Sequence, residues 1–197
     1  MASIETIIKV AKENNGIITT AMVVLNGISR GSLKHFVDKG LIEKVSRGVY
    51  ILPEFWEDEF INLQSRFKRG IFSLETALFL CDLTDRTPNR YSMTFPNTYN
   101  VTQAKAIGVI CSQSQEPMYS MGIVDLKTPN GNIVKGYCVE RTLCDILKPR
   151  NHIDIQIVSE AYKRYAKGKS RNIPLLSEFA KILKVEKRLR AYLEVLL

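Results

Sequence analysis

Residues 19–50 constrain the fold more than any other stretch of this chain. They read TTAMVVLNGISRGSLKHFVDKGLIEKVSRGVY. Thr19 or Thr20 can cap a short apolar helix, because a side-chain hydroxyl there accepts a free backbone N–H of the first turn. The pair Asn26-Gly27 then ends this helix, since both residues tolerate the backbone conformation that follows a last turn. The pattern predicts a short helix followed by a tight turn.

A second helix is expected directly after that turn. Ser29 caps it, and Leu33, Phe36 and Val37 fall at the i, i+3 and i+4 spacing that places apolar side chains on one face. Gly40 ends the helix.

Two short strands follow, at residues 41–45 and 48–52, and both are rich in Val, Ile, Leu and Tyr. Ser46, Arg47 and Gly48 join them into a hairpin with a cationic tip. Helix, turn, helix and basic hairpin in this order predict a winged helix-turn-helix, whose second helix enters the DNA major groove while the hairpin approaches the neighbouring backbone. Helix-turn-helix geometry also serves as a protein-binding scaffold, so this alternative stays open.

The residues expected at DNA are small, polar or cationic. Arg30, Lys34 and His35 are the candidates for reading bases, because an arginine can form two hydrogen bonds with guanine. Phosphate contacts are assigned to side chains at a helix N-terminus or on the hairpin. The predicted DNA-binding set is Thr19, Thr20, Ser29, Arg30, Ser32, Lys34, His35, Lys44, Arg47 and Tyr50. The alternatives are a solvated helix face, and for Tyr50 simple packing beneath the hairpin.

The rest of the chain predicts a second, larger domain. Residues 1–53 form the winged helix, beginning with an amphipathic helix at 3–15, and residues 54–69 are a connecting helix or linker. Residues 70–197 are expected to form a mixed α/β domain, with a small, mainly antiparallel sheet followed by C-terminal helices. The alternation at 91–95 is typical of a half-exposed strand. The predicted fold class is α+β.

The charge of +8 is concentrated near the two ends of the chain. The net charge is +3 over residues 1–53, −1 over 54–69, −1 over 70–140 and +7 over 141–197. Two basic zones around a neutral one fit a nucleic-acid footprint. The densest cationic segment is a possible second basic surface that binds DNA, RNA or a nucleotide, or only keeps the domain soluble; it comprises Lys163, Arg164, Lys167, Lys169 and Arg171.

No residue pattern indicates a catalytic centre, a metal site or a cofactor. The four cysteines form no C-x-x-C pair and have no histidine at ligand spacing, so free thiols in a reducing compartment are expected. Arg141 and Asp145, four residues apart on a predicted helix, are expected to pair as ions in a structural role. No membrane-spanning run or signal peptide is present, which predicts a cytoplasmic protein.

These motifs together resemble the AbiEi antitoxins of bacterial abortive-infection systems. The resemblance rests on the wing Val45-Ser46-Arg47-Gly48-Val49-Tyr50 and on the downstream segment Val139-Glu140-Arg141-Thr142-Leu143-Cys144-Asp145, followed by Tyr162, Tyr165 and a closing Leu-Arg-Ala-Tyr-Leu-Glu run.

The resemblance implies a type IV antitoxin that counteracts a nucleotidyltransferase-like toxin, with or without a stable complex, and represses its own operon by binding promoter inverted repeats. Two alternatives remain: a stand-alone winged-helix regulator with a ligand-sensing C-terminal domain, and a nucleic-acid-processing enzyme. The oligomeric state is open, since two monomers can also occupy two half-sites cooperatively.

Overall fold

The protein has the α+β fold that the sequence predicts. A computed structural model describes residues 4–196. The chain divides into two compact units. The N-terminal unit contains the residues up to Lys68 together with the segment Lys127–Val134. The C-terminal unit contains Arg69–Leu126 and the residues from Lys135 onward.

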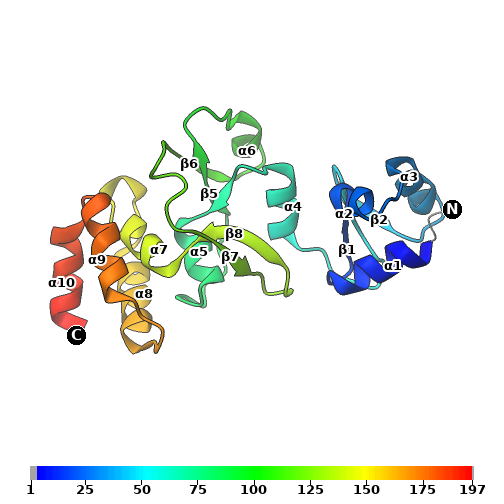
Figure 1. Ribbon diagram of the computed structural model, residues 1–197. Helices are drawn as coiled ribbons and strands as arrows, with labels where there is room; N and C mark the ends of the chain where they lie inside the picture. The colour runs from blue at the N-terminus through cyan, green and yellow to red at the C-terminus, as the bar shows by residue number, and fades with distance from the viewer. Residues whose placement is uncertain (1–3, 197) are drawn as a thin grey trace. The chain divides into compact units, whose positions relative to one another are not determined.

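The N-terminal unit begins with three helices and a three-stranded sheet, in the element order expected from the sequence with one added strand (Figure 1). The sheet has the order β1-β3-β2, and both of its pairings are antiparallel. In chain order the elements are α1 (Ile4–Glu13), β1 (Ile17–Thr19), α2 (Thr20–Leu25), α3 (Arg30–Asp38), β2 (Glu43–Ser46) and β3 (Val49–Ile51).

The two inner helices begin at the hydroxyl residues that the sequence indicates. The Thr19 Oγ1 accepts a hydrogen bond from the Met22 N–H at 3.2 Å, and the Ser29 Oγ accepts one from the Gly31 N–H at 3.3 Å. Gly27 lies in the turn between the helices with φ +70°, a conformation that glycine adopts without steric cost. Local capping chemistry therefore fixes both helix starts.

One apolar core holds this domain together. Its buried residues come from all three helices and from the strands and loops around them: Ile7, Ala11, Ile18, Val23, Ile28, Leu33, Phe36, Ile42 and Leu52. Val24 and Leu25 of the short apolar helix α2 lie outside this core, because they are 46% and 85% exposed. A six-residue helix turns only one narrow stripe toward the core, and on α2 that stripe is Val23.

Strand β1 was not predicted. Its residues Ile17 and Ile18 pair with Ile51 and Tyr50 of β3. Three residues are too few for a period-2 pattern, so this strand depends on the hairpin beside it.

Helix α4 (Glu59–Arg66) is held through its N-cap residue Asp58, which is buried. The Asp58 Oδ1 accepts hydrogen bonds from the backbone N–H groups of Phe60 at 3.0 Å and Ile61 at 3.4 Å. Its Oδ2 accepts from the Thr128 hydroxyl at 2.6 Å and from the Asn132 amide at 2.8 Å. One carboxylate thus joins two segments that are about seventy residues apart in sequence.

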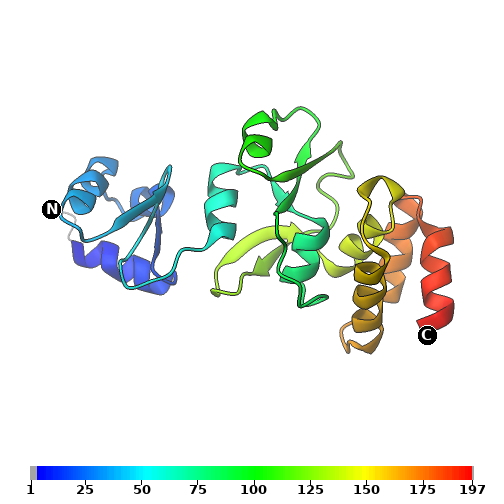
Figure 2. The same ribbon diagram turned by 180° about the vertical axis from the view of Figure 1, so that it is seen from behind.

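The C-terminal unit is built on a five-stranded sheet of order β6-β5-β4-β8-β7. Its strands are β4 (Ile71–Phe72), β5 (Ser92–Pro96), β6 (Ile110–Ser114), β7 (Ile123–Lys127) and β8 (Ile133–Tyr137). Helices α5 (Leu74–Leu80) and α6 (Thr102–Ala106) lie between the first three strands in sequence. Figure 2 shows this sheet from behind.

The sheet departs from its prediction in two ways. It is mixed rather than mainly antiparallel, because β5 pairs in parallel with β6, and β4 with β8. Strand β5 is buried along its whole length instead of half-exposed. It lies inside the sheet, so Ser92 and Thr94 are buried, and the Thr94 hydroxyl donates to the Ser73 Oγ at 3.0 Å. The alternating pattern could not reveal this central position.

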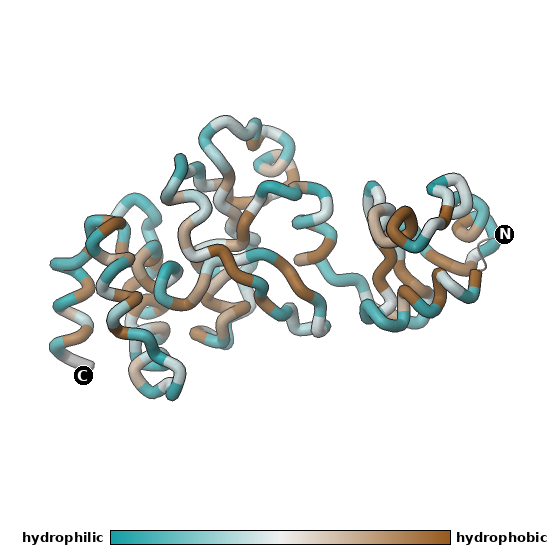
Figure 3. The backbone as a smooth tube through the Cα atoms, viewed as in Figure 1, coloured by the Kyte–Doolittle hydropathy of each residue, from teal (hydrophilic) through white to brown (hydrophobic). Residues whose placement is uncertain are grey.

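The C-terminal helices are α7 (Val139–Ile146), a short 3₁₀ helix η1 (Pro149–Asn151), α8 (Ile155–Lys167), α9 (Ile173–Ile182) and α10 (Glu186–Leu196). In both views α8, α9 and α10 lie side by side. Their apolar faces share a core with α5 and α7 that includes Leu78, Leu143, Tyr162 and Leu176. The connection from α8 to α9 is hydrophilic (Figure 3). No helix among residues 4–196 combines the length and apolar character needed to cross a membrane.

Candidate nucleic-acid interface

Helix α3 is amphipathic in the way that a DNA-reading helix requires. Leu33 and Phe36 are buried in the core, whereas Arg30, Lys34 and His35 are exposed. Arg30 and Lys34 are four residues apart, so they extend from the same face of the helix. The structure therefore places the three predicted base-reading side chains in solvent, on the helix that follows the turn.

The two serines of this helix occupy different positions. Ser29 is exposed, and its hydroxyl oxygen already accepts the Gly31 N–H as the helix cap. Ser32 is half-buried on the first turn. Both side chains are small, which leaves the N-terminal end of α3 open to close approach by a ligand backbone.

The wing is the hairpin of β2 and β3. Arg47 and Gly48 form its tip, and Arg47 is exposed. Gly48 has φ +79°, and a Cβ there would meet the Thr20 Oγ1 at 3.0 Å. The tip thus needs glycine both for its backbone conformation and for the space beside α2.

Thr20, one of the predicted phosphate contacts, is hydrogen-bonded to the wing. Its backbone N–H donates to the Gly48 carbonyl at 2.9 Å, and its hydroxyl donates to the same oxygen at 3.3 Å. Both donors are therefore used to attach the wing to the start of α2. Thr19 is half-buried and its hydroxyl oxygen caps the same helix. Thr19 therefore fixes the start of α2, and Thr20 fixes the wing against it.

Lys44 and Tyr50 are register partners across the wing. Lys44 is exposed, while Tyr50 is half-buried and packs against the apolar core of the domain. This agrees with the packing alternative for Tyr50.

The cations of this surface carry uncompensated charge. Among the described residues, Arg30, Lys34, Lys44 and Arg47 form no ion pair with an acidic side chain. Such charges remain available to release counterions from a nucleic-acid backbone.

Two of the five cations of the second basic surface already have partners within the protein. Arg164 pairs with both oxygens of Asp85 and with Glu160, the latter at 3.0 Å. These hydrogen bonds lower the pKa of the Asp85 carboxyl and raise that of the Arg164 guanidinium. The Arg171 guanidinium donates to the Ala166 carbonyl at 2.5 Å. Lys163, Lys167 and Lys169 are exposed, so the segment offers three lysines rather than five available cations.

The Glu-Arg-Thr-Leu-Cys-Asp segment forms a buried network in α7. The predicted pair of Arg141 and Asp145 is confirmed, with the Arg141 Nε 2.8 Å from the Asp145 Oδ2. Glu140 accepts hydrogen bonds from the Tyr165 hydroxyl at 3.2 Å and from the Asn172 N–H at 3.3 Å. Within residues 4–196, no three His, Cys, Asp or Glu side chains converge as metal ligands would.

The family comparison adds a finding that agrees with this geometry. Residues 5–53 match the family model described as "Transcriptional regulator, AbiEi antitoxin". The N-terminal domain is thus similar to the regulator domain of AbiEi antitoxins. The matched residues span α1 to β3, which is the helix-turn-helix and its wing. The similarity therefore covers the N-terminal domain and stops before α4.

Among solved structures, the chain is similar to the RV2827C protein from Mycobacterium tuberculosis, with a TM-score of 0.48 and 13% sequence identity. The match covers 96% of this chain and 79% of that one. No curated protein matches the sequence significantly.

Proposed function

We propose that this AbiEi-type regulator is the antitoxin of a type IV toxin–antitoxin pair and represses its own operon by binding promoter inverted repeats. The single observation that supports this most directly is the exposed cationic face of α3 and the wing, on the segment that matches the AbiEi model. A regulator of this kind acts in the cytoplasm, where the promoter lies.

The toxin in this proposal is nucleotidyltransferase-like and acts in phage defence by abortive infection. The C-terminal unit relieves its toxicity without a stable complex being required. Two monomers then occupy the two half-sites, with DNA bending as a source of cooperativity.

The chain acts by binding rather than by catalysis in this proposal. The polar groups of the Glu-Arg-Thr-Leu-Cys-Asp segment support this, because Glu140, Arg141 and Asp145 already have hydrogen-bond partners inside the fold.

Titration of labelled promoter DNA at several salt concentrations tests the interface. Arg47→Ala should weaken binding to cognate and scrambled DNA alike and lower the slope of log K against log salt by about 0.9, because one phosphate contact is lost. Arg30→Ala should cost about 1–3 kcal/mol on the cognate site and relax preference at one position. Lys12→Ala, an exposed cation of α1, is the matched control. Unchanged binding by both variants would refute the assignment.

Co-expression with the neighbouring reading frame tests the antitoxin role. Growth arrest by the neighbour that this chain relieves supports the proposal, and relief should persist in the Arg47→Ala variant, since neutralisation is assigned to the other unit. A neighbour with no toxicity would overturn the antitoxin role and leave the DNA-binding function standing.

A further inference from the structure

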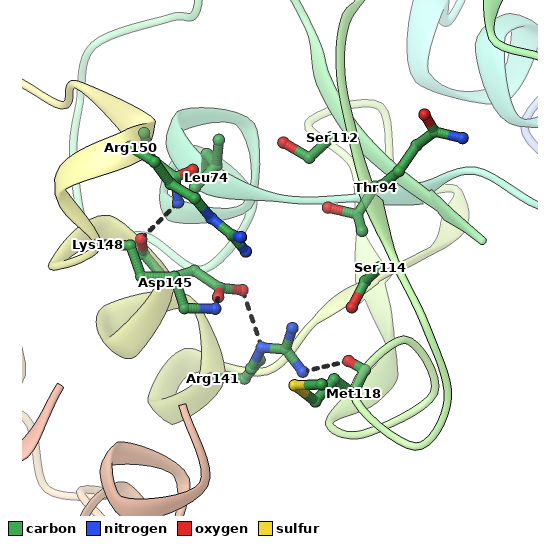
Figure 4. A pocket seen from close by; sticks show the side chains of 11 residues that line it. Leu74, Thr94, Ser112, Ser114, Met118, Arg141, Asp145, Lys148 and Arg150 are labelled. Carbon is green, nitrogen blue, oxygen red and sulfur yellow. Dashed lines mark hydrogen bonds and ion pairs between the residues drawn. The ribbon is translucent and has the colours of Figure 1, made fainter. Parts of the chain in front are cut away.

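A polar cavity of about 290 Å³ lies within the C-terminal unit, and none of the residues assigned to DNA lines it. Figure 4 shows its lining: α7 and η1 provide cationic side chains, and strands β5 and β6 provide hydroxyl groups opposite them. The volume is near the lower end of the range for small-molecule sites.

The cationic wall carries more positive than negative charge. Asp145 accepts a hydrogen bond from the Arg141 Nε at 2.8 Å and another from the Lys148 Nζ at 2.6 Å. Two cations therefore share one carboxylate. Arg150 adds a third cation, which is exposed and forms no ion pair within the described part of the chain. The four charged groups that line the cavity have a net charge of about +2, so an anion is the ligand that they favour.

The Arg141 guanidinium is fixed in place before any ligand arrives. Its Nη1 donates to the carbonyls of Met118 at 2.7 Å and Met121 at 2.9 Å, and its Cζ lies 4.4 Å from the centre of the Tyr137 ring. The side chain is only 3% exposed. A buried guanidinium that is held on several sides presents a preorganised positive charge, so a ligand need not order it on binding.

The hydroxyl wall follows from the register of two parallel strands. Ser112 and Ser114 are two residues apart on β6, so both project from the same face of the sheet. Thr94 of β5 is the register partner of Ser112 and lines the same cavity. The Thr94 hydroxyl already donates to Ser73, whereas Ser112 and Ser114 form no side-chain hydrogen bond with other described residues. Two hydroxyl donors are therefore available opposite the cations.

We propose that this cavity binds the phosphate group of a small molecule, with Arg150 and Lys148 supplying charge and Ser112 and Ser114 supplying hydroxyl donors. A phosphate has several acceptor oxygens and so can engage both walls at once, and charge-assisted hydrogen bonds of this kind are short and strong. This goes beyond the proposed function, because it assigns the C-terminal unit a ligand that neither DNA binding nor toxin neutralisation requires.

Isothermal titration calorimetry on the full-length protein tests the site, with inorganic phosphate and adenosine 5′-monophosphate as separate probes. Sodium chloride keeps the ionic strength constant, so general screening cannot produce the signal. Arg150→Gln is the main variant, because Arg150 is exposed and its replacement leaves the buried network intact. Ser114→Ala is the second variant. Lys181→Gln, which removes an exposed cation of α9 outside the cavity, is the matched control.

At least one probe should bind the wild-type protein, and Arg150→Gln should weaken that binding about tenfold or more, as expected for the loss of a hydrogen bond to a charged group. Ser114→Ala should weaken it by a smaller factor, and Lys181→Gln should leave it unchanged. Binding of phosphate alone identifies free phosphate as the ligand source, and tighter binding of the nucleotide identifies a phosphate ester.

The proposal is overturned if neither probe binds at millimolar concentration, or if Arg150→Gln binds as tightly as wild type. Binding of a short RNA but of neither small probe would also overturn it. A promoter titration with wild-type protein is run in parallel. Normal DNA binding without phosphate binding refutes the cavity assignment alone, whereas the opposite result refutes the proposed DNA-binding function alone.

Discussion

Replacing Asp58 by alanine should destabilise the N-terminal unit by about 3–5 kcal/mol, because one buried carboxylate holds four donors. Loss of the α4 cap contributes about 1 kcal/mol. The Thr128 hydroxyl and the Asn132 amide lose their shared acceptor while their residues remain buried, and each costs about 1–2 kcal/mol. The loss exceeds that of an ordinary exposed cap, since both partners lie in another segment of the chain.

Urea unfolding followed by circular dichroism measures this effect. Asp58→Asn keeps one oxygen for the cap but places an amide nitrogen against two donors, so its cost should be intermediate. Glu57→Ala, an exposed neighbour whose backbone carbonyl accepts the Asn130 amide, is the control and should stay within about 0.5 kcal/mol of wild type.

A double-mutant cycle with Thr128→Val isolates the hydroxyl–carboxylate contact, which should show a coupling energy of about 1 kcal/mol or more. An Asp58→Ala protein as stable as wild type, or a coupling energy near zero, would refute the reasoning that this carboxylate joins the two segments.

Two further predictions concern a pair of glycines with positive φ and a buried thiol. Gly27→Ala should lower the free energy of unfolding by about 1 kcal/mol, because of its positive φ alone. Gly48→Ala should lower it by more, since the added Cβ also meets Thr20. Urea unfolding measures both variants, and equal losses of stability would contradict this prediction. Burial raises the pKa of the Cys144 thiol to about 12, above the usual value of about 8.5 in an unfolded chain. The unfolded state therefore loses its proton first, and stability should fall as the pH rises above about 8.5. Cys144→Ala should show a smaller loss between pH 8 and pH 10, and an identical loss would exclude this thiol as a cause.

The sequence determined the local structure of the winged helix. Thr19 and Ser29 cap helices because their hydroxyl oxygens are correctly placed within a few residues, and Gly48 turns the wing because few other residues adopt a positive φ. The similarity of residues 5–53 to the AbiEi model was accessible for the same reason, since its motif lies in a short continuous segment. The pairing of Arg141 with Asp145 also followed from spacing alone, because i and i+4 are neighbours on any helix.

Only the tertiary structure decided which polar groups lie together. Asp58 gave no signal in the sequence because its partners are about seventy residues away. The ion pair of Arg164 with Asp85 could not be predicted, because the two residues are 79 apart in sequence and meet only in the folded protein. The cavity likewise lies between residues of the paired strands β5 and β6 and residues of α7 and η1. Neither segment indicates a binding site by itself. Short-range periodicity and capping arise between near neighbours, whereas burial and long-range hydrogen bonds depend on how the strands pair and the helices pack.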